Sequence, residues 1–297
     1  MQKQDLTVVI LTFNEELHIR RCLENVKSIA EDIVVIDCFS TDATRKICEE
    51  MGVKLVEHEW PGNQAEQFNW AIDNVPIHTK WIMRLDADEY LSKELVCEIE
   101  DKLSETPDAV NGIHLLRKVF FQGKLMKHGP TISLLRIFRN GFGKSEVRIM
   151  DEHIVLSEGE TVQYNALFYD DSKIDLDDFV KKHLGYAKRN AAEFLNMKYG
   201  LRDADDHGLQ GQAAFKRKLK KVYLNLPLFV RPFLYFIYRY FIRGSFLEGK
   251  EGFLWCFYQS WWYSTVVDTR LWEIQKACGT DKDKIRDYLK IIYGISM

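Results

Sequence analysis

Asp86 and Asp88 are two carboxylates separated by a single residue, and they follow an apolar stretch at residues 81–83. Mg²⁺ and Mn²⁺ bind proteins through one or two carboxylates and fill their remaining positions with water and phosphate oxygens. The spacing therefore predicts a divalent metal site that receives a diphosphate substrate. The alternative is a solvated turn before the next helix, in which Asp86, Asp88 and Glu89 only face water.

Polar residues also follow two earlier apolar stretches. The stretches at 6–11 and 33–36 are short and rich in β-branched residues, and helical spacing follows them at 17–29 and about 43–51. Strands that alternate with helices in this way predict a mainly parallel sheet covered on both faces. Such sheets bind ligands beyond the carboxyl ends of their strands. The polar residues at these ends are Asn14, Glu15, Asp37, Asp42, Asp86 and Asp88.

The pattern changes in the second half of the chain. Short strand-like pieces at 113–116 and 134–138 give way after about residue 171 to helical spacing, with one helix expected over 176–197. Acidic residues in the first turn of that helix complement its dipole. We therefore expect an α/β catalytic domain over residues 1–170 and a helical region over residues 171–297.

Composition indicates a packed, enzyme-sized globular protein. The 297 residues are 46% hydrophobic and 29% charged, with a net charge of -3, which argues against disorder and collagen-like or repeat architectures. The six cysteines form no CxxC pair and are expected to be reduced. No basic segment or cleavage-like site precedes the first apolar stretch, so we expect no secretory signal and a cytoplasmic location.

Three motifs together resemble the family 2 glycosyltransferases of the GT-A fold. They are Thr12-Phe13-Asn14-Glu15, Asp37 with Ser40-Thr41-Asp42, and Leu85-Asp86-Ala87-Asp88-Glu89. The likeness is strongest to bacterial enzymes that build lipopolysaccharide core, O-antigen or capsule sugars. It covers most of the chain, because residues 226–227, 231–233 and 246–252 resemble the membrane-proximal region of the same subgroup.

The resemblance implies a site for a nucleotide diphosphate sugar. Asp88 would bind Mn²⁺ or Mg²⁺, and Asp86 would contact the nucleotide or a water on the metal. Glu15 and Asp37 offer the acceptors that a pyrimidine N–H and ribose hydroxyls require, unless both only cap strand ends. The full donor site implied is Thr12, Phe13, Asn14, Glu15, Asp37, Ser40, Asp42, Gln67, Asn69, Arg84, Asp86 and Arg136.

An inverting transfer also needs a general base, which takes the proton of the acceptor hydroxyl. Asp151 and Glu152 lie where the family carries its acidic base, and we favour Glu152. The alternative is a surface turn with His153 packed nearby. Basic residues in the same part of the sequence are candidates for diphosphate or acceptor contacts; they are Arg136, Arg139 and His128.

The chain departs from the family pattern at three places. Phe39 stands where glycine is common, and Phe68 stands near the place of a usual basic residue. Tyr169-Asp170 replaces a late histidine that serves many relatives as a metal ligand. Metal affinity could accordingly depend on Asp170, on His153, or on neither.

The C-terminal third combines basic and aromatic residues. A basic cluster at 216–221 precedes apolar segments, and the longest uncharged run, 252–267, has 16 residues, whereas a bilayer span needs about 20. This predicts a helical pair lying on anionic lipid, with Trp255, Trp261 and Trp262 at headgroup depth. The alternative is an internal helical core or a dimer interface. No nucleic-acid module accompanies the basic residues, so nucleic acid is not expected as a partner.

The sequence thus predicts an inverting, metal-assisted transferase of a hexose or N-acetylhexosamine. The donor is expected to be a UDP-sugar, and the acceptor a lipid-linked oligosaccharide or lipopolysaccharide core. We expect the enzyme on the inner face of the bacterial inner membrane, where it could also form a homo-oligomer. One alternative is a sugar-phosphate nucleotidyltransferase, but no glycine-rich loop follows Leu11. The other is a non-catalytic protein on the same scaffold.

Overall fold

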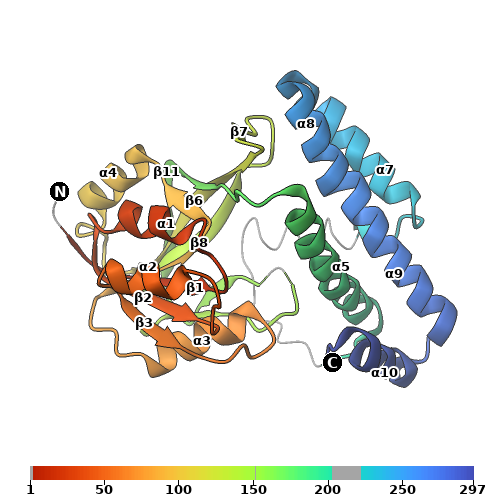
Figure 1. Cartoon of the computed structure of the whole chain (residues 1–297), viewed down its shortest axis with the longest axis horizontal. Coiled ribbons are helices and arrows are strands. Elements are labelled where there is room, and N and C mark those ends of the chain that lie inside the picture. Colours follow the sequence, from red (N-terminus) through yellow and green to blue (C-terminus); the bar gives the residue numbers. More distant parts are fainter. Residues whose placement is uncertain (1–2, 151, 203–221) are drawn as a thin grey trace. The chain divides into compact units, whose positions relative to one another are not determined.

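A computed structural model describes residues 3–150, 152–202 and 222–297, and their contacts group them into two compact units (Figure 1). The first unit contains residues 3–125, 130–147 and 152–173. The second contains the short pieces 126–129 and 148–150 together with the described residues after 173. The chain therefore passes into the second unit twice before the main division after Lys173.

The first unit is built on one large sheet with the strand order β3-β2-β1-β4-β8-β6-β11-β5. Strand β1 pairs in parallel with β2 and β4, and β6 pairs in parallel with β11, whereas β8 runs antiparallel to both β4 and β6. The strands are β1 (Gln4–Thr12), β2 (Ala30–Asp37), β3 (Lys54–Glu57), β4 (Trp81–Asp86), β5 (Glu89–Leu91), β6 (Val110–Phe121), β7 (Lys124–Leu125), β8 (Ile132–Arg139) and β11 (Glu160–Asp170). Of these, β7 lies outside the order given above and pairs with β6. A separate pair is formed by β9 (Gly143–Ser145) and β10 (Ile154–Leu156).

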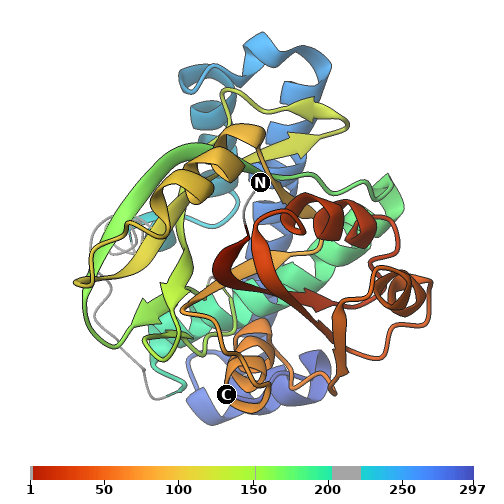
Figure 2. The same cartoon turned by 90° about the vertical axis from the view of Figure 1, so that its left-hand side faces the viewer.

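Helices cover both faces of this sheet (Figures 1 and 2). Val8 and Ile10 of β1 join one apolar cluster with α1 (Ile19–Val26), α2 (Thr44–Glu50) and α4 (Lys93–Lys102). Val9 faces the other way, into a second cluster with α3 (Gln64–Asn74). Because both faces are buried, the central strands are apolar at successive positions, which is the pattern that the sequence shows.

The second unit is helical. Helix α5 (Leu176–Tyr199) begins at Asp175, whose side chain accepts a hydrogen bond from the Asp178 N–H at 2.9 Å, and ends at Gly200 in a left-handed conformation. Its alanine-rich face packs with α9 (Tyr263–Cys278) and α10 (Lys282–Tyr293) in one apolar cluster.

A helical hairpin forms the rest of the second unit (Figure 1). Helix α7 (Val230–Ile237) continues into a π-helical turn η1 (Tyr238–Ile242), and a short 3₁₀ turn η2 (Ser245–Glu248) leads back. The returning run consists of α8 (Gly249–Cys256), a second π-helical segment η3 (Phe257–Trp262) and α9. Along the described residues, no helix combines the length and the apolar character that crossing a membrane requires.

Aromatic rings hold the two arms of the hairpin together. The Trp261 ring lies 5.2 Å from that of Phe233 and 5.4 Å from that of Phe236, measured between ring centroids. Trp255 is buried and packs over the guanidinium of Arg239. The expectation that Trp255 meets lipid headgroups is therefore wrong, because this ring belongs to the interior of the hairpin.

Candidate functional site

The register of the parallel strands brings three strand ends to one edge of the sheet. Thr12, the last residue of β1, lies beside Asp37, the last residue of β2. On the other side of β1, Leu11 pairs with Asp86, the last residue of β4. The polar residues that follow β1, β2 and β4 in the sequence consequently share this edge.

The Asp37 side chain organises the loop after β2. Its carboxylate is fully buried and accepts hydrogen bonds from the Thr12 hydroxyl at 2.8 Å, the Ser40 N–H at 2.7 Å and the Ser40 hydroxyl at 2.6 Å. Hydrogen bonds to a charged acceptor are stronger than neutral ones. Asp37 therefore fixes the conformation of the loop after β2 and joins it to the end of β1.

The loop after β1 interlocks with the loop after β2. Asn14 adopts a left-handed conformation (φ +56°), which asparagine tolerates, and its N–H donates to the Ser40 hydroxyl at 2.8 Å. Its side-chain oxygen accepts from the Thr41 N–H at 2.9 Å. The Asp42 carboxylate accepts from the N–H groups of Glu16 at 3.0 Å and Thr44 at 2.9 Å. The hydrogen bonds of Asn14, Ser40 and Asp42 therefore hold the two loops in a defined conformation.

Glu15 is held by a histidine. The Glu15 Oε2 lies 2.7 Å from Nδ1 of buried His18, and the His18 Nε2 accepts from the Lys173 N–H at 2.9 Å. Because Nε2 accepts, Nδ1 carries the proton and donates it to Glu15. His18 gave no signal in the sequence, since a lone histidine at the start of a helix is common.

Two phenylalanines at this edge are exposed. Phe13 follows β1, and Phe39, in a left-handed conformation (φ +57°), follows β2. The Thr12 carbonyl accepts a hydrogen bond from the Cys38 N–H at 2.9 Å, which joins the two chain segments just before both rings. Bulky residues rarely adopt positive φ. The Phe39 conformation is therefore imposed by the loop that Asp37 and Ser40 fix.

Arginines surround the first carboxylate of the acidic motif. The Asp86 Oδ2 lies 3.4 Å from Arg136 Nη2, and its Oδ1 lies 3.8 Å from Arg84 Nε. Burial alone would raise the pKa of Asp86, but the charges of Arg136, Arg84 and Arg117 outweigh it and hold the pKa at about 2. Asp86 therefore remains ionised across the physiological range.

Glu89 contacts Asp86 and two of the arginines that surround it. It is buried, and it accepts from Arg136 Nη2 at 2.7 Å, from Arg117 Nη1 at 3.4 Å and from the Asp86 N–H at 3.0 Å. Burial, only partly offset by the Arg136 charge, raises the pKa of Glu89 to about 7. Arg117 was missed in the sequence, although a charged residue within the apolar strand β6 was a signal.

Asp88 and Asp86 fit the demands of Mg²⁺ or Mn²⁺, since these ions need only one or two carboxylates beside water and phosphate. The backbone carbonyl of Asp88 is fixed by the N–H of Asp171 at 3.1 Å and by Arg21 Nη2 at 3.0 Å. Within the described residues, no group of three or more His, Cys, Asp or Glu side chains could hold a metal. A bound ion would therefore take its ligands from Asp86, Asp88 and the substrate.

The two candidates for a third ligand differ in position. Asp170 pairs with Glu89 across the ladder between β11 and β5, and its Oδ2 lies 3.6 Å from Arg117 Nη1. The His153 carbonyl instead accepts from the Glu146 N–H at 2.9 Å, and the His153 N–H donates to Glu146 Oε1 at 3.1 Å. Asp170 is accordingly beside the acidic motif.

Glu152 reaches the same edge from a distant part of the sequence. Its Oε1 lies 3.3 Å from Nη2 of buried Arg84, which also lies 3.4 Å from the Gln64 Oε1. Arg84 therefore links Glu152 to Asp86. Asp151, the other candidate base, lies outside the described residues.

Two implied donor residues are occupied by internal contacts. Buried Gln67 bonds through Oε1 to His58 Nδ1 at 2.7 Å. Asn69 donates to the Ser145 carbonyl and accepts from the Ser145 N–H, both at 2.8 Å, so it fastens α3 to β9. These contacts hold both side chains in place, and their implied role in donor binding stays a prediction.

Two basic candidates lie elsewhere. Arg139 pairs with Trp81, at the opposite end of β4 from Asp86, and donates to the Val110 carbonyl at 2.8 Å. The expected diphosphate contact at Arg139 is therefore wrong. His128 belongs to the second unit, where its N–H and its ring contact Glu248.

Comparisons with known proteins find similar glycosyltransferases. Residues 7–152 match the model of Glycosyl transferase family 2. An uncharacterized glycosyltransferase of Rickettsia typhi is 24% identical over 260 residues, covering 84% of this chain and 80% of the relative. Another, of Rickettsia bellii, is 39% identical over 95 residues, covering 32% and 31%.

A solved structure shares the fold. The mannosyltransferase PcManGT from Pyrobaculum calidifontis, in complex with GDP-Man and Mn²⁺, superposes with a TM-score of 0.50 at 14% identity, covering 92% of this chain and 88% of that one. The expected fold class, a GT-A sheet flanked by helices and followed by a helical C-terminal region, is confirmed.

Proposed function

We propose, from the match of residues 7–152 to the model of Glycosyl transferase family 2, that the protein transfers one sugar with inversion from a UDP-sugar. The transferred group would be a hexose or N-acetylhexosamine. The acceptor would be a lipid-linked oligosaccharide or a lipopolysaccharide core, met on the inner face of the bacterial inner membrane.

One observation carries this proposal. Arg84 lies 3.8 Å from Asp86 and 3.3 Å from Glu152, so the acidic motif and the candidate base share one edge of the sheet. A transferase needs a cation-binding carboxylate on the leaving-group side and a proton acceptor on the nucleophile side. Arg84 holds these two functions side by side.

The nucleoside would lie on the loops after β1 and β2. Glu15 is oriented by His18 and offers an acceptor to a uracil N–H or a ribose hydroxyl. Exposed Phe13 supplies an apolar face for the base. These features support UDP, and GDP-Man is the comparison donor that distinguishes a pyrimidine from a purine preference.

Asp88 and Asp86 would hold Mn²⁺ or Mg²⁺, which neutralises charge on the diphosphate leaving group when it is bound. Arg136 and Arg84 add fixed positive charge beside Asp86. Glu152 would take the proton of the acceptor hydroxyl as that oxygen attacks the anomeric carbon. Arg84 orients Glu152 through the contact at 3.3 Å.

The test measures UDP release from a panel of UDP-sugars and from GDP-Man with Mn²⁺, with and without bacterial lipid extract as acceptor. We expect UDP release that requires Mn²⁺ and rises with the extract. Pyrophosphate release from UTP and a sugar 1-phosphate would instead indicate a nucleotidyltransferase. The absence of both reactions, with an intact fold, would contradict the proposal.

A further inference from the structure

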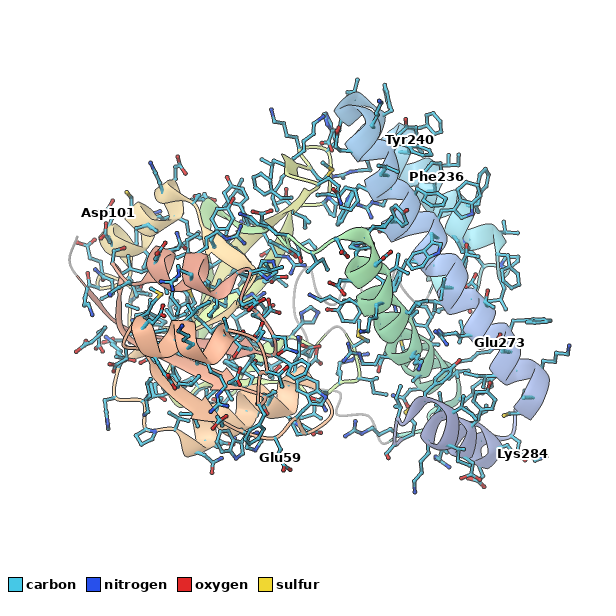
Figure 3. The ribbon with its side chains drawn as sticks, viewed as in Figure 1. Glu59, Asp101, Phe236, Tyr240, Glu273 and Lys284 are labelled. Atoms are coloured by element: carbon cyan, nitrogen blue, oxygen red, sulfur yellow. The ribbon has the colours of Figure 1, made fainter. Side chains whose placement is uncertain are left out.

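The turn of the helical hairpin presents apolar side chains to solvent. Phe241 is 54% exposed, Ile242 73%, Phe246 47% and Leu247 65%. We call these four residues, with Arg243 and Lys250, the hairpin tip. Figure 3 shows Tyr240, next to the tip in sequence, at the turn end of the hairpin. Soluble surfaces rarely expose so many large apolar side chains together.

The backbone of the hairpin tip is held in one conformation by specific contacts. A Cβ on Gly252 would lie 2.1 Å from the Ser245 carbonyl oxygen, so the turn requires glycine there to close tightly. Buried Glu248 accepts hydrogen bonds from His128 and anchors the turn. The Arg243 N–H donates to the Tyr238 carbonyl at 2.9 Å. The apolar side chains are therefore held outward by fixed backbone.

The tip carries exposed positive charge. Arg243 and Lys250 are exposed, and no Asp or Glu stands between Asp206 and Glu248 in the sequence. Glu248 is only 4% exposed and is engaged by His128. An anionic surface complements this arrangement.

A groove beside the tip also combines apolar side chains with a positive charge. It is a shallow depression, open to solvent, and is lined by Tyr240, Gly249, Lys250, Phe253 and Leu254. Rings and an aliphatic side chain beside one ammonium group match a phospholipid, which offers a phosphate next to apolar chains.

A second copy of the chain fits the tip less well. In a symmetric contact the patch meets the same patch of the other copy, which would bring the positive charges of two Arg243 and two Lys250 side chains to one interface. Like charges across an interface are unfavourable. A bilayer containing anionic lipid accepts both the apolar residues and the charges.

We propose that the hairpin tip docks on an anionic phospholipid bilayer, with Phe241, Ile242, Phe246 and Leu247 entering the acyl boundary and Arg243 and Lys250 contacting lipid phosphates. The inference deepens the proposed function, on which it rests for the lipid nature of the acceptor. It also places the membrane contact at aliphatic and phenyl side chains of the turn instead of at Trp255.

The test compares binding of the full chain to vesicles of phosphatidylglycerol with phosphatidylcholine and to vesicles of phosphatidylcholine alone. A variant with Phe241→Ser, Ile242→Ser, Phe246→Ser and Leu247→Ser should bind the anionic vesicles at least about ten-fold more weakly. A matched control, Ile291→Ser with Ile292→Ser, removes two residues of α10 that are 77% and 56% exposed and should change nothing.

The charges are tested by Arg243→Gln with Lys250→Gln. Each basic residue near an anionic surface contributes about five-fold in binding, so about a 25-fold loss is expected on anionic vesicles. The loss should be small on phosphatidylcholine alone. Donor-only UDP release should be equal in all these variants, so failure of the proposed function would appear there and not in vesicle binding.

Two outcomes would overturn the inference. One is wild-type binding by the serine variant. The other is an absence of binding to anionic vesicles by the wild type. A dimer in sedimentation velocity that the serine variant abolishes would then make the tip an interface between copies.

Discussion

Two carboxylates at the site differ in their neighbours and hence in their expected tasks. Asp86 lies among the charges of Arg136 and Arg84, which keep it ionised. Glu152 contacts one of these arginines, at 3.3 Å, and is the proposed proton acceptor. Asp88 completes the motif.

Asp88→Asn should abolish the Mn²⁺-dependent part of UDP-sugar binding, because an amide is a poor substitute for a carboxylate on a hard cation. Titration calorimetry with and without Mn²⁺ measures this. The melting temperature should stay near that of the wild type, since Asp88 is not fully buried. Undiminished metal-dependent affinity would remove Asp88 from the metal site.

Glu152→Gln should keep UDP-sugar binding and lower turnover by about 100-fold or more, the size expected for a lost general base. The amide oxygen can still accept from Arg84, so the geometry of the edge should survive. Steady-state kinetics with the lipid acceptor gives the comparison, with Asp151→Asn as the matched control. If Asp151→Asn has the larger effect, Asp151 is the base.

Loops and helices hold the site through buried polar contacts. The loop after β2 is shaped by Asp37, which accepts three hydrogen bonds, and α3 is fastened to β9 by Asn69. In the second unit the base of the hairpin is fixed by buried Asp268, whose Oδ1 lies 2.9 Å from Arg231 Nε and whose Oδ2 accepts from the Phe229 N–H at 2.8 Å.

Asp37→Asn should lower the free energy of unfolding by about 1–3 kcal/mol, because an amide N–H₂ would oppose donors that a carboxylate satisfies. Urea denaturation followed by circular dichroism measures the loss. Asp32→Asn, an exposed position on the same strand, is the control and should be close to neutral. Equal stability of both variants would show that Asp37 does not organise the loop.

Asp268→Asn should destabilise the second unit by about 3–5 kcal/mol, because it leaves the Arg231 guanidinium buried without a counter-charge. Thermal unfolding is the readout, with Asp283→Asn, at an exposed pair with Arg286, as the control. Replacing both partners, with Arg231→Met and Asp268→Leu, should recover most of the loss. A single variant as stable as the wild type would contradict this account.

At the scale of the whole molecule, a unit that carries the candidate site is joined in one chain to a helical unit with an apolar, basic tip. The proposed lipid-linked acceptor and the proposed docking of the tip on a bilayer depend on both units. The basic cluster at residues 216–221, which lies outside the described residues, precedes the hairpin in the sequence. We expect it to add long-range attraction to the short-range contacts of the tip.

Glutamine at Lys216, Arg217, Lys218, Lys220 and Lys221 should weaken binding to anionic vesicles, measured by sedimentation, by about three orders of magnitude at low salt. The effect should shrink in 0.5 M salt, where the screening length falls to about 4 Å. Glutamine at Lys282, Lys284 and Lys290, three exposed lysines of α10, is the control. A loss that does not depend on salt would point to a packing role for the cluster.

The sequence alone determined the elements and the chemistry of the edge. Strands β1, β2 and β4 are continuous apolar runs because both faces of the sheet are covered, and local pattern reports burial directly. The polar residues after these strands could be assigned to one edge, because parallel strands share the direction of their carboxyl ends. The motif order around Asp37, Asp86 and Asp88 added the resemblance to family 2 glycosyltransferases.

The tertiary structure decided what those residues contact. Arg84 and Glu152 are 68 positions apart, and no local pattern reveals their pairing at 3.3 Å. The sequence also did not reveal that Trp255 is buried whereas Phe241 and Leu247 are exposed. All three side chains are apolar, and only the tertiary packing decides which apolar residues lie in the core. Register and packing are long-range properties, and they alone showed which charges meet at the edge and which apolar side chains remain exposed.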